Sequence, residues 1–165
     1  MRTFMIQPDL SLYELEDYFG KLSGNKGWIT KRSAERIKLV MEMAKIWANN
    51  STCPKGKRHA CIILYYNKYI IGMGYNGPPS RMEPCKECVY ASSKDNVNFN
   101  ECPAVHSEVN AVINMNGQTF LTRSPKIGGM AVVTKTPCKH CRAVLLNAGI
   151  STVTVNEVKE NGHSK

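Results

Sequence analysis

The sequence predicts an α/β fold, and three observations favour this class. A strand, helix, strand succession fills residues 130–155, two adjoining β-rich runs lie at residues 61–73, and a long amphipathic helical pattern precedes both at residues 31–49. The 165 residues, of which 42% are hydrophobic, suffice for one core of ordinary size. We therefore expect a single domain, residues 1–165, in which helices cover a β-sheet.

The first 30 residues are the least informative, and we treat residues 1–30 as an N-terminal extension. Ser11 and Glu14 fit the Ser-x-x-Glu capping-box pattern, which predicts a short helix that continues through Phe19 and ends in a glycine-containing stretch. The next helix spans residues 31–49, where apolar residues recur at intervals of three and four. This stripe predicts a face packed on the core rather than a cofactor site. Its members are Ile37, Val40, Met41, Ala44 and Ala48.

Residues 61–66 and 69–73 predict two strands joined by a tight turn at Asn67 and Lys68, which is typical of a β-hairpin. The glycine and proline cluster Gly74-Tyr75-Asn76-Gly77-Pro78-Pro79 follows directly. Such a cluster is usually only a loop. Because it leaves a strand and precedes the metal motif described below, a loop that contacts a substrate is an equally good interpretation at this stage.

The polar stretch at residues 80–103 is too long for an unsupported loop in a compact domain, so we expect something to hold it. We treat it as an insert that carries cysteines. A helix is expected at residues 106–115, with Gly117 as its stop. Strand 130–133, helix 138–148 and strand 152–155 then form the βαβ unit, whose strands should be parallel with a right-handed crossover.

Two short motifs predict a catalytic zinc site. His106 begins one predicted helix, and Cys138 and Cys141 begin the other, in the pattern His-x-Glu with Pro-Cys-x-x-Cys. Three protein ligands leave the fourth tetrahedral position open for water, as catalytic zinc sites do. Glu108 follows His106 by two positions, where its carboxylate would lie beside that water and carry protons. His140, between the two cysteines, is expected to face away from the metal.

Each half of this pattern has an ordinary explanation when taken alone. A His-x-Glu is often only a polar helix start, and a Cys-x-x-Cys could be a redox pair or half of a structural zinc site. The conjunction of the two at predicted helix starts favours the metal hydrolase, because this combination is the signature of zinc nucleobase deaminases.

Composition and charge indicate where the protein is expected to be found and which partners it is expected to bind. No apolar run is long enough to span a bilayer and no signal-peptide core is present, so we expect a cytoplasmic chain that makes no membrane contact. Seven cysteines clustered with His and Pro then favour metal ligation over disulfides. The net charge of +9 is compatible with nucleic-acid binding, but the basic residues form no dense run with interleaved aromatics. Small phosphorylated ligands are the favoured partners.

The motifs together resemble the zinc-dependent cytidine and deoxycytidylate deaminase family over about residues 33–156. The zinc motif marks the superfamily, as do Val133 to Cys141 and Asn147 to Ile150 around it. The Gly74 to Pro79 loop, with the cysteine-bearing insert at residues 80–103 behind it, resembles the deoxycytidylate deaminases within that family.

This resemblance implies a three-layer α/β/α sandwich with a mixed five-stranded sheet. It also implies hydrolytic deamination of dCMP to dUMP and ammonia, which supplies dUMP for thymidylate synthesis, with dCTP left open as a second substrate. The usual assembly is a homohexamer that dCTP activates and dTTP inhibits, with Mg accompanying a bound nucleotide. The alternatives are a deaminase of tRNA adenosine or of guanine, and a non-catalytic zinc-finger protein that binds nucleic acid.

The resemblance also assigns roles to individual residues. Asn76 would bond the sugar hydroxyl or the base, and Gly77 would let the backbone approach the substrate. Cys53, Cys85, Cys88 and Cys102 match ligands of a second, structural zinc, with His59 as a substitute for one of them. From residue type alone, the phosphate candidates are Arg58, Arg81, Lys135 and Lys139.

Four positions carry expectations of their own. Cys61 lies in a strand pattern and is expected to be a buried apolar residue. Ser107 stands where the family commonly has alanine, a small exchange that should leave the site undisturbed. Arg58 and His59 stand before Ala60, where the family usually has a small apolar pair. They place charge beside the predicted strand that leads into the zinc site.

Overall fold

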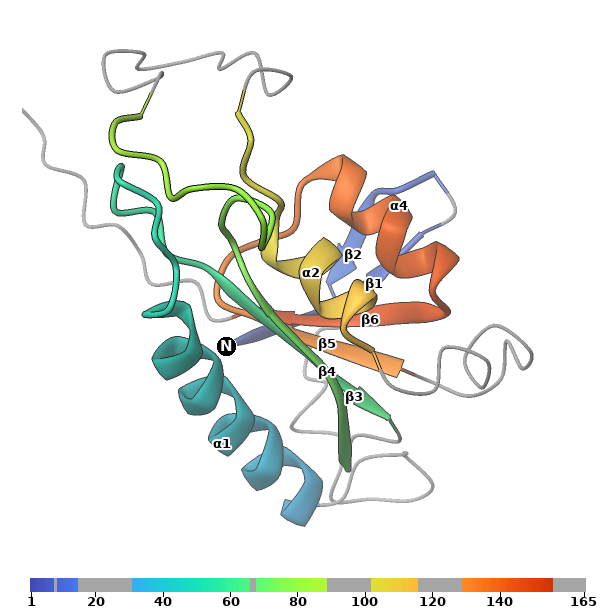
Figure 1. Ribbon diagram of the computed structural model, residues 1–165. Coiled ribbons are helices and arrows are strands. Elements are labelled where there is room, and N and C mark those ends of the chain that lie inside the picture. Colours follow the sequence, from blue (N-terminus) through green and yellow to red (C-terminus); the bar gives the residue numbers. More distant parts are fainter. Residues whose placement is uncertain (8, 15–30, 66–67, 89–101, 116–128, 156–165) are drawn as a thin grey trace, which may run out of the picture.

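The described part of the chain forms one mixed sheet with helices on both of its faces (Figure 1). The structure is a computed structural model that describes residues 1–7, 9–14, 31–65, 68–88, 102–115 and 129–155. Its elements are β1 (Arg2–Ile6), β2 (Leu12–Glu14), α1 (Lys31–Ala48), β3 (Ala60–Tyr65), β4 (Tyr69–Tyr75), α2 (Ser107–Ile113), β5 (Gly129–Val133), α4 (Lys139–Asn147) and β6 (Ile150–Val155). The predicted α/β class is confirmed.

The strand order among the described residues is β2-β1-β6-β5-β3-β4. β3 and β4 pair antiparallel, which confirms the predicted hairpin, and β5 and β6 pair parallel, which confirms the strand orientation predicted for the βαβ unit. The carboxyl end of β5 therefore leads into the start of α4, and the antiparallel neighbour β3 begins beside that same end. This arrangement gathers the predicted metal motif and the segment before β3 at one edge of the sheet.

Alternation along β3 divides the core into two layers. Ile62 and Leu64 face α1, where they pack against the apolar stripe predicted for that helix. Cys61 and Ile63 face the opposite side, where they join the cluster that contains residues of α2 and α4. Successive strand side chains point to opposite faces, so one strand serves both layers. The predicted three-layer α/β/α arrangement is confirmed.

The expected short helix at Ser11 to Phe19 is wrong where the structure describes it. Leu12–Glu14 is strand β2, paired antiparallel with β1, which itself pairs with β6. The carboxylate Oδ1 of Asp9 accepts the backbone N–H of Ser11 at 2.9 Å, and this turn reverses the chain between the strands. Asp and Ser bond nearby backbone in turns as readily as at helix starts, so the capping pattern was ambiguous. Residues 15–30 lie outside the described residues.

The two N-terminal strands also change the strand count. The sheet has six strands in the described residues rather than the expected five, because β1 and β2 extend it beyond β6. Arg2–Ile6 and Leu12–Glu14, within the predicted N-terminal extension, are thus strands of the sheet. Within the described ranges, no helix is long and apolar enough to cross a membrane. The predicted helix stop Gly117 lies outside the described residues.

Helix α2 lies against β4 at unusually close range. A side chain at Gly72 or Gly74 would collide with backbone atoms of α2, among them the amide nitrogen and carbonyl oxygen of Ala111. Two side-chain amides of the helix bond the strand directly. Asn110 donates to the carbonyl of Tyr75 at 2.8 Å, and Asn114 donates to the carbonyl of Met73 at 3.1 Å. Glycine on the strand and asparagine on the helix therefore fix the height of α2 above the sheet.

We expect Gly74→Ala to lower the free energy of unfolding by about 1–3 kcal/mol or more, because its methyl group would meet helix backbone that can move only with the whole helix. Chemical denaturation measures this change. Gly77→Ala is the matched control, since the nearest atoms to its added carbon lie at 3.9 Å, an ordinary contact. Equal losses in the two variants would contradict the close packing described for α2.

Candidate metal centre and its cavity

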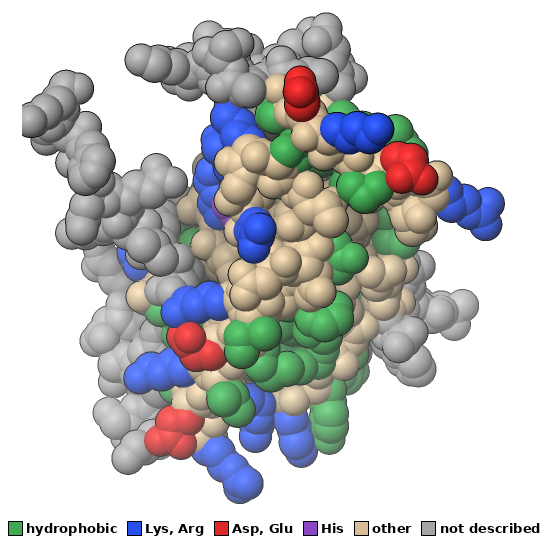
Figure 2. All heavy atoms as spheres, turned by 60° about the vertical axis from the view of Figure 1, so that its left-hand side comes forward, with side chains coloured by type: hydrophobic (Ala, Val, Ile, Leu, Met, Phe, Trp, Pro, Cys, Tyr) green, Lys and Arg blue, Asp and Glu red, His purple; other side chains and the backbone are tan. Residues whose placement is uncertain are grey.

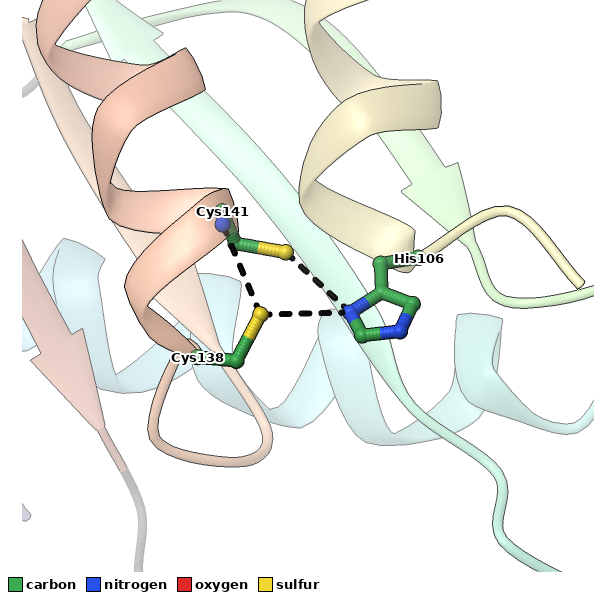
Figure 3. A group of neighbouring side chains, drawn as sticks. All are labelled: His106, Cys138 and Cys141. Carbon is green, nitrogen blue, oxygen red and sulfur yellow. Dashed lines mark hydrogen bonds between the residues drawn. The ribbon is translucent and has the colours of Figure 1, made fainter. Parts of the chain in front are cut away.

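Three predicted ligands converge from the starts of two helices. His106 is the residue before α2, and Cys138 is the residue before α4, which also carries Cys141 in its first turn. The Nδ1 atom of His106 lies 3.2 Å from Sγ of Cys141 and 3.6 Å from Sγ of Cys138. Figure 3 shows the imidazole nitrogen pointing at both sulfurs. In the described residues this is the only group of three or more metal-ligating side chains whose donor atoms lie within 4.8 Å of one another.

The donor set fits zinc in kind and in spacing. Ligand atoms about 2.0–2.3 Å from a tetrahedral zinc lie roughly 3.3–3.8 Å from one another, close to the distances seen here. The cysteine sulfurs and imidazole nitrogen are the ligand types that zinc prefers. The backbone N–H of Cys141 also points at Sγ of Cys138, at 3.5 Å. The start of α4 therefore holds Cys138 in place without help from a metal.

The environment of Cys141 shows what a cation would change. Burial raises the pKa of the Cys141 thiol, and the nearby Glu108 carboxylate and Cys138 sulfur raise it further. Each of these effects opposes a negative charge on sulfur. A bound divalent cation acts in the opposite sense, because a thiol that coordinates zinc is deprotonated outright. The buried thiol, the second sulfur and the carboxylate thus form a cluster that a dication would stabilise.

Glu108 is buried at 6% exposure in the first turn of α2 and lies beside this cluster. Its oxygen Oε2 accepts a hydrogen bond of 3.0 Å from the hydroxyl of Ser107, which is itself buried. Sequence reasoning placed Glu108 beside the metal but gave Ser107 no role, because serine in place of the common alanine was expected to leave the site undisturbed. The only signal for Ser107 was its position next to a carboxylate that the motif required to be near the metal.

A cavity of about 370 Å³ is lined by two of the ligands, His106 and Cys138, and by Glu108. Its volume falls within the roughly 300–1,000 Å³ that is typical of pockets for small ligands. Lys55, Lys57, His59 and Lys135 are also part of the lining, and we call the first three the basic wall. Among the described residues that line the cavity, Glu108 is the only acidic one. The cavity therefore combines an acid and two candidate metal ligands with cationic groups suited to a phosphorylated ligand.

The basic wall is formed largely by the segment before β3. Residues 55, 57 and 59 line the cavity, whereas Arg58 is exposed and is not part of the lining. The chain turns at residues 54–55, and Gly56 follows with φ 69°, so no simple strand period governs which side chains face the cavity. Sequence reasoning therefore missed Lys55 and Lys57, and of its four phosphate candidates only Lys135 lines the cavity.

The glycine and proline loop joins the cavity wall through Asn76. Its Oδ1 accepts the backbone N–H of His59 at 2.7 Å, and its Nδ2 donates to the carbonyl of Lys57 at 2.8 Å. Gly77 uses its N–H and its carbonyl to bridge Val105, the residue before the histidine ligand. Asn76 lines the cavity and Gly77 does not. The loop thus ties the basic wall to the metal ligand.

Several other predicted residues lie away from the cavity. Arg81 and Lys139 are exposed and do not line it, and His140 is exposed and outside the ligand group, as expected. Cys61 is fully buried, in agreement with the prediction of an apolar core residue. It lies on the α2 and α4 side of the sheet, where burial and the Glu108 carboxylate raise the pKa of its thiol.

The four cysteines expected to hold a second zinc are all half-buried and unpaired. Cys53, Cys88 and Cys102 line the same cavity as the metal ligands, and Cys85 does not. In the part of the chain that the structure describes, these four do not come within the 4.8 Å that the first ligand group satisfies. The structural zinc therefore stays a prediction.

Comparison with known proteins gives a consistent result. Residues 34–157 match the family described as the cytidine and deoxycytidylate deaminase zinc-binding region. The deoxycytidylate deaminase of Mycobacterium phage D29 is 29% identical over 113 residues, which cover 64% of this chain and 82% of that protein. The human deoxycytidylate deaminase is 32% identical over 117 residues, which cover 68% of this chain but only 60% of the human protein.

The fold also matches solved structures. The crystal structure of dCMP deaminase from the cyanophage S-TIM5, in complex with dCMP and dUMP, aligns with a TM-score of 0.51 at 24% identity. The alignment covers 70% of this chain and 76% of the cyanophage chain. At this level of identity the match establishes the fold.

Proposed function

Because the chain belongs to the cytidine and deoxycytidylate deaminase family, we propose that it is a zinc-dependent hydrolase that converts dCMP and water to dUMP and ammonia. The observation that carries this proposal is the group of His106, Cys138 and Cys141, two of which, His106 and Cys138, line one cavity together with the carboxylate of Glu108. The names of the curated relatives support dCMP as the substrate.

The residues divide the chemistry between them. Zinc held by His106, Cys138 and Cys141 would supply a water molecule whose pKa is lowered from about 15.7 toward 7. Glu108 would accept one proton from that water and donate it to N3 of the cytosine ring, and would then accept the proton of the hydroxyl group added at C4 and donate it to the amino group at C4. The C4–N bond breaks, ammonia leaves, and the oxygen from water remains on C4 of the uracil product. A carboxylate that accepts and returns each proton needs no other acid.

The cationic wall supports a phosphorylated substrate. Lys55, Lys57 and Lys135 would meet the 5′-phosphate, because an ammonium group forms strong charge-assisted hydrogen bonds with phosphate oxygens. Asn76 would contact the sugar from the same wall, and Gly77 would shape the loop that carries it. Arg58 would add positive charge from outside the cavity.

The remaining family features are part of the same proposal. A homohexamer controlled by dCTP and dTTP, with Mg accompanying a bound effector, would control the supply of dUMP for thymidylate synthesis. Self-association is supported by the outer face of α1, where Leu39, Met43, Ile46 and Trp47 expose apolar surface. Figure 2 shows apolar side chains among Lys and Arg on the side of the molecule where α1 lies. The unpaired cysteines suit a reducing cytoplasm and a second zinc at Cys53, Cys85, Cys88 and Cys102.

Ammonia release tests the proposed function. Zinc-loaded protein is assayed with dCMP, dCTP, deoxycytidine, guanine and a tRNA anticodon stem. We expect kcat/KM to be highest for dCMP and at least about ten-fold lower for deoxycytidine, which lacks the phosphate that the lysines would bind. Turnover of guanine or tRNA without turnover of cytosine nucleotides would refute the proposal in favour of another deaminase. Binding of nucleic acid without any turnover would favour a zinc-finger protein.

The same assay tests the phosphate wall. Lys135→Gln should raise KM for dCMP about ten-fold and leave deoxycytidine unaffected. Lys68→Gln is the matched control, because Lys68 lies at the far end of the β3 and β4 hairpin, where its ammonium contacts the ring of Tyr69. An equal effect of Lys135→Gln on both substrates would exclude a phosphate contact.

A further inference from the structure

The catalytic carboxylate has a buried hydroxyl partner that follows from neither motif. Ser107 is 3% exposed and Glu108 is 6% exposed, and the hydroxyl of Ser107 donates to Oε2 of Glu108 at 3.0 Å. Buried polar groups almost always have such partners, because an unbonded one loses its interactions with water without compensation. The contact is therefore a fixed part of the site rather than one of many exchangeable solvent bonds.

The usual reason for serine at a helix start does not apply here. A capping serine precedes the helix and accepts a backbone N–H of the first turn. In α2 that place belongs to His106, which makes no side-chain cap bond, and Ser107 is the first residue inside the helix. Alanine at this position would be compatible with the helix. The hydroxyl of Ser107 is therefore directed at the carboxylate rather than used to cap α2.

We propose that Ser107 is a positioning residue that holds Oε2 of Glu108 so that its other oxygen, Oε1, faces the reacting atoms. This inference rests on the proposed function. A proton carrier must stay within hydrogen-bond reach of the water, of N3 and of the leaving amino group in turn, and small errors of position slow each transfer. The hydroxyl keeps its own proton throughout, so it adds orientation and no chemical step.

The test is a graded series at one position. Ser107→Ala removes the donor, and Ser107→Cys keeps a weaker one at similar size. We expect kcat for dCMP to fall about ten-fold in Ser107→Ala and by less in Ser107→Cys, with KM and bound zinc unchanged. Affinity for the product dUMP should also be unchanged. Affinity for the 2-pyrimidinone analogue of dCMP, whose hydrate resembles the tetrahedral intermediate, should fall in parallel with kcat.

A matched control separates chemistry from stability. Thr154→Val also removes a buried hydroxyl, one that bonds Thr3 at 2.9 Å on the far strands of the sheet, and it should lower stability without lowering kcat. A Ser107→Ala variant with unchanged kcat would overturn the inference alone. So would a loss of kcat accompanied by equal losses of zinc and dUMP affinity, which indicate a structural role. A wild-type protein that deaminates no cytosine nucleotide would overturn the proposed function together with this inference.

Discussion

Glu108→Gln is expected to lower kcat for dCMP by about 10²–10⁴-fold while bound zinc stays at the wild-type level. The amide has nearly the same shape as the carboxylate and can still accept the hydroxyl of Ser107, so the fold around α2 should persist. It cannot accept and return a proton. Steady-state ammonia release, with zinc measured by mass spectrometry on the same sample, gives both quantities.

Glu42→Gln is the control for this variant. It makes the same chemical change on the exposed face of α1, where Glu42 pairs with Lys45 at 2.7 Å and such a surface pair contributes little to stability. Its turnover should match that of the wild type. A Glu108→Gln enzyme that kept most of its rate would disprove the role assigned to the carboxylate.

Cys138→Ala should abolish turnover, with a loss greater than about 10²-fold, because the cavity loses both a ligand and the chemistry that the metal supplies. The thiol of Cys138 is exposed, but its sulfur caps α4 by accepting the backbone N–H of Cys141 at 3.5 Å, so its removal should also lower the stability of the metal-free protein. Zinc content after dialysis and the response to added zinc measure the effect. Chelated wild-type protein should regain activity with zinc, and the variant should not.

Cys61→Ala provides the contrast for a ligand variant. Cys61 lies in the core on the same side of the sheet and outside the ligand group, so its truncation should reduce stability and leave zinc in place.

The number of zinc ions bound per chain is informative as well. Two zinc ions in the wild type and one in Cys138→Ala would support the predicted second site. Loss of zinc in Cys61→Ala but not in Cys138→Ala would contradict the metal centre.

The sequence predicted that His106, Cys138 and Cys141 lie together, and the structure brings these three side chains together, because the spacing of each motif is local. His106 and Cys138 each precede a helix, and a helix start fixes where the next two or three side chains point. The strands and helices of the layers were likewise predictable, because periods of two and of three to four residues mark their buried faces. The sequence could not show how close the starts of α2 and α4 lie to each other, and the structure supplies that distance.

Other parts of the site depended on contacts between distant residues. Asn76 bonds the backbone 17 and 19 residues earlier, and no local pattern distinguishes that role from contact with a sugar. The strands β1 and β2 were missed because Ser11 and Glu14 fit a turn as well as a helix cap. Ser107 and Glu108 are adjacent in sequence, but the role proposed for their hydrogen bond depends on the burial of both side chains. The sequence does not show that burial.

The close packing of α2 on the glycines of β4 separates substitutions that would move Glu108 from substitutions that would change only the cavity lining. Glu108 lies on α2, and the position of this helix depends on glycines of β4 and on Asn110. The basic wall belongs to the segment before β3, which Asn76 bonds at the end of β4. We expect exchanges at Lys55 or Lys57 to alter the charge and shape of the cavity, while α2 keeps its place on β4 and holds Glu108 where it is. A scaffold built in this way would allow new ligand preferences to arise without changes to the proposed catalytic groups.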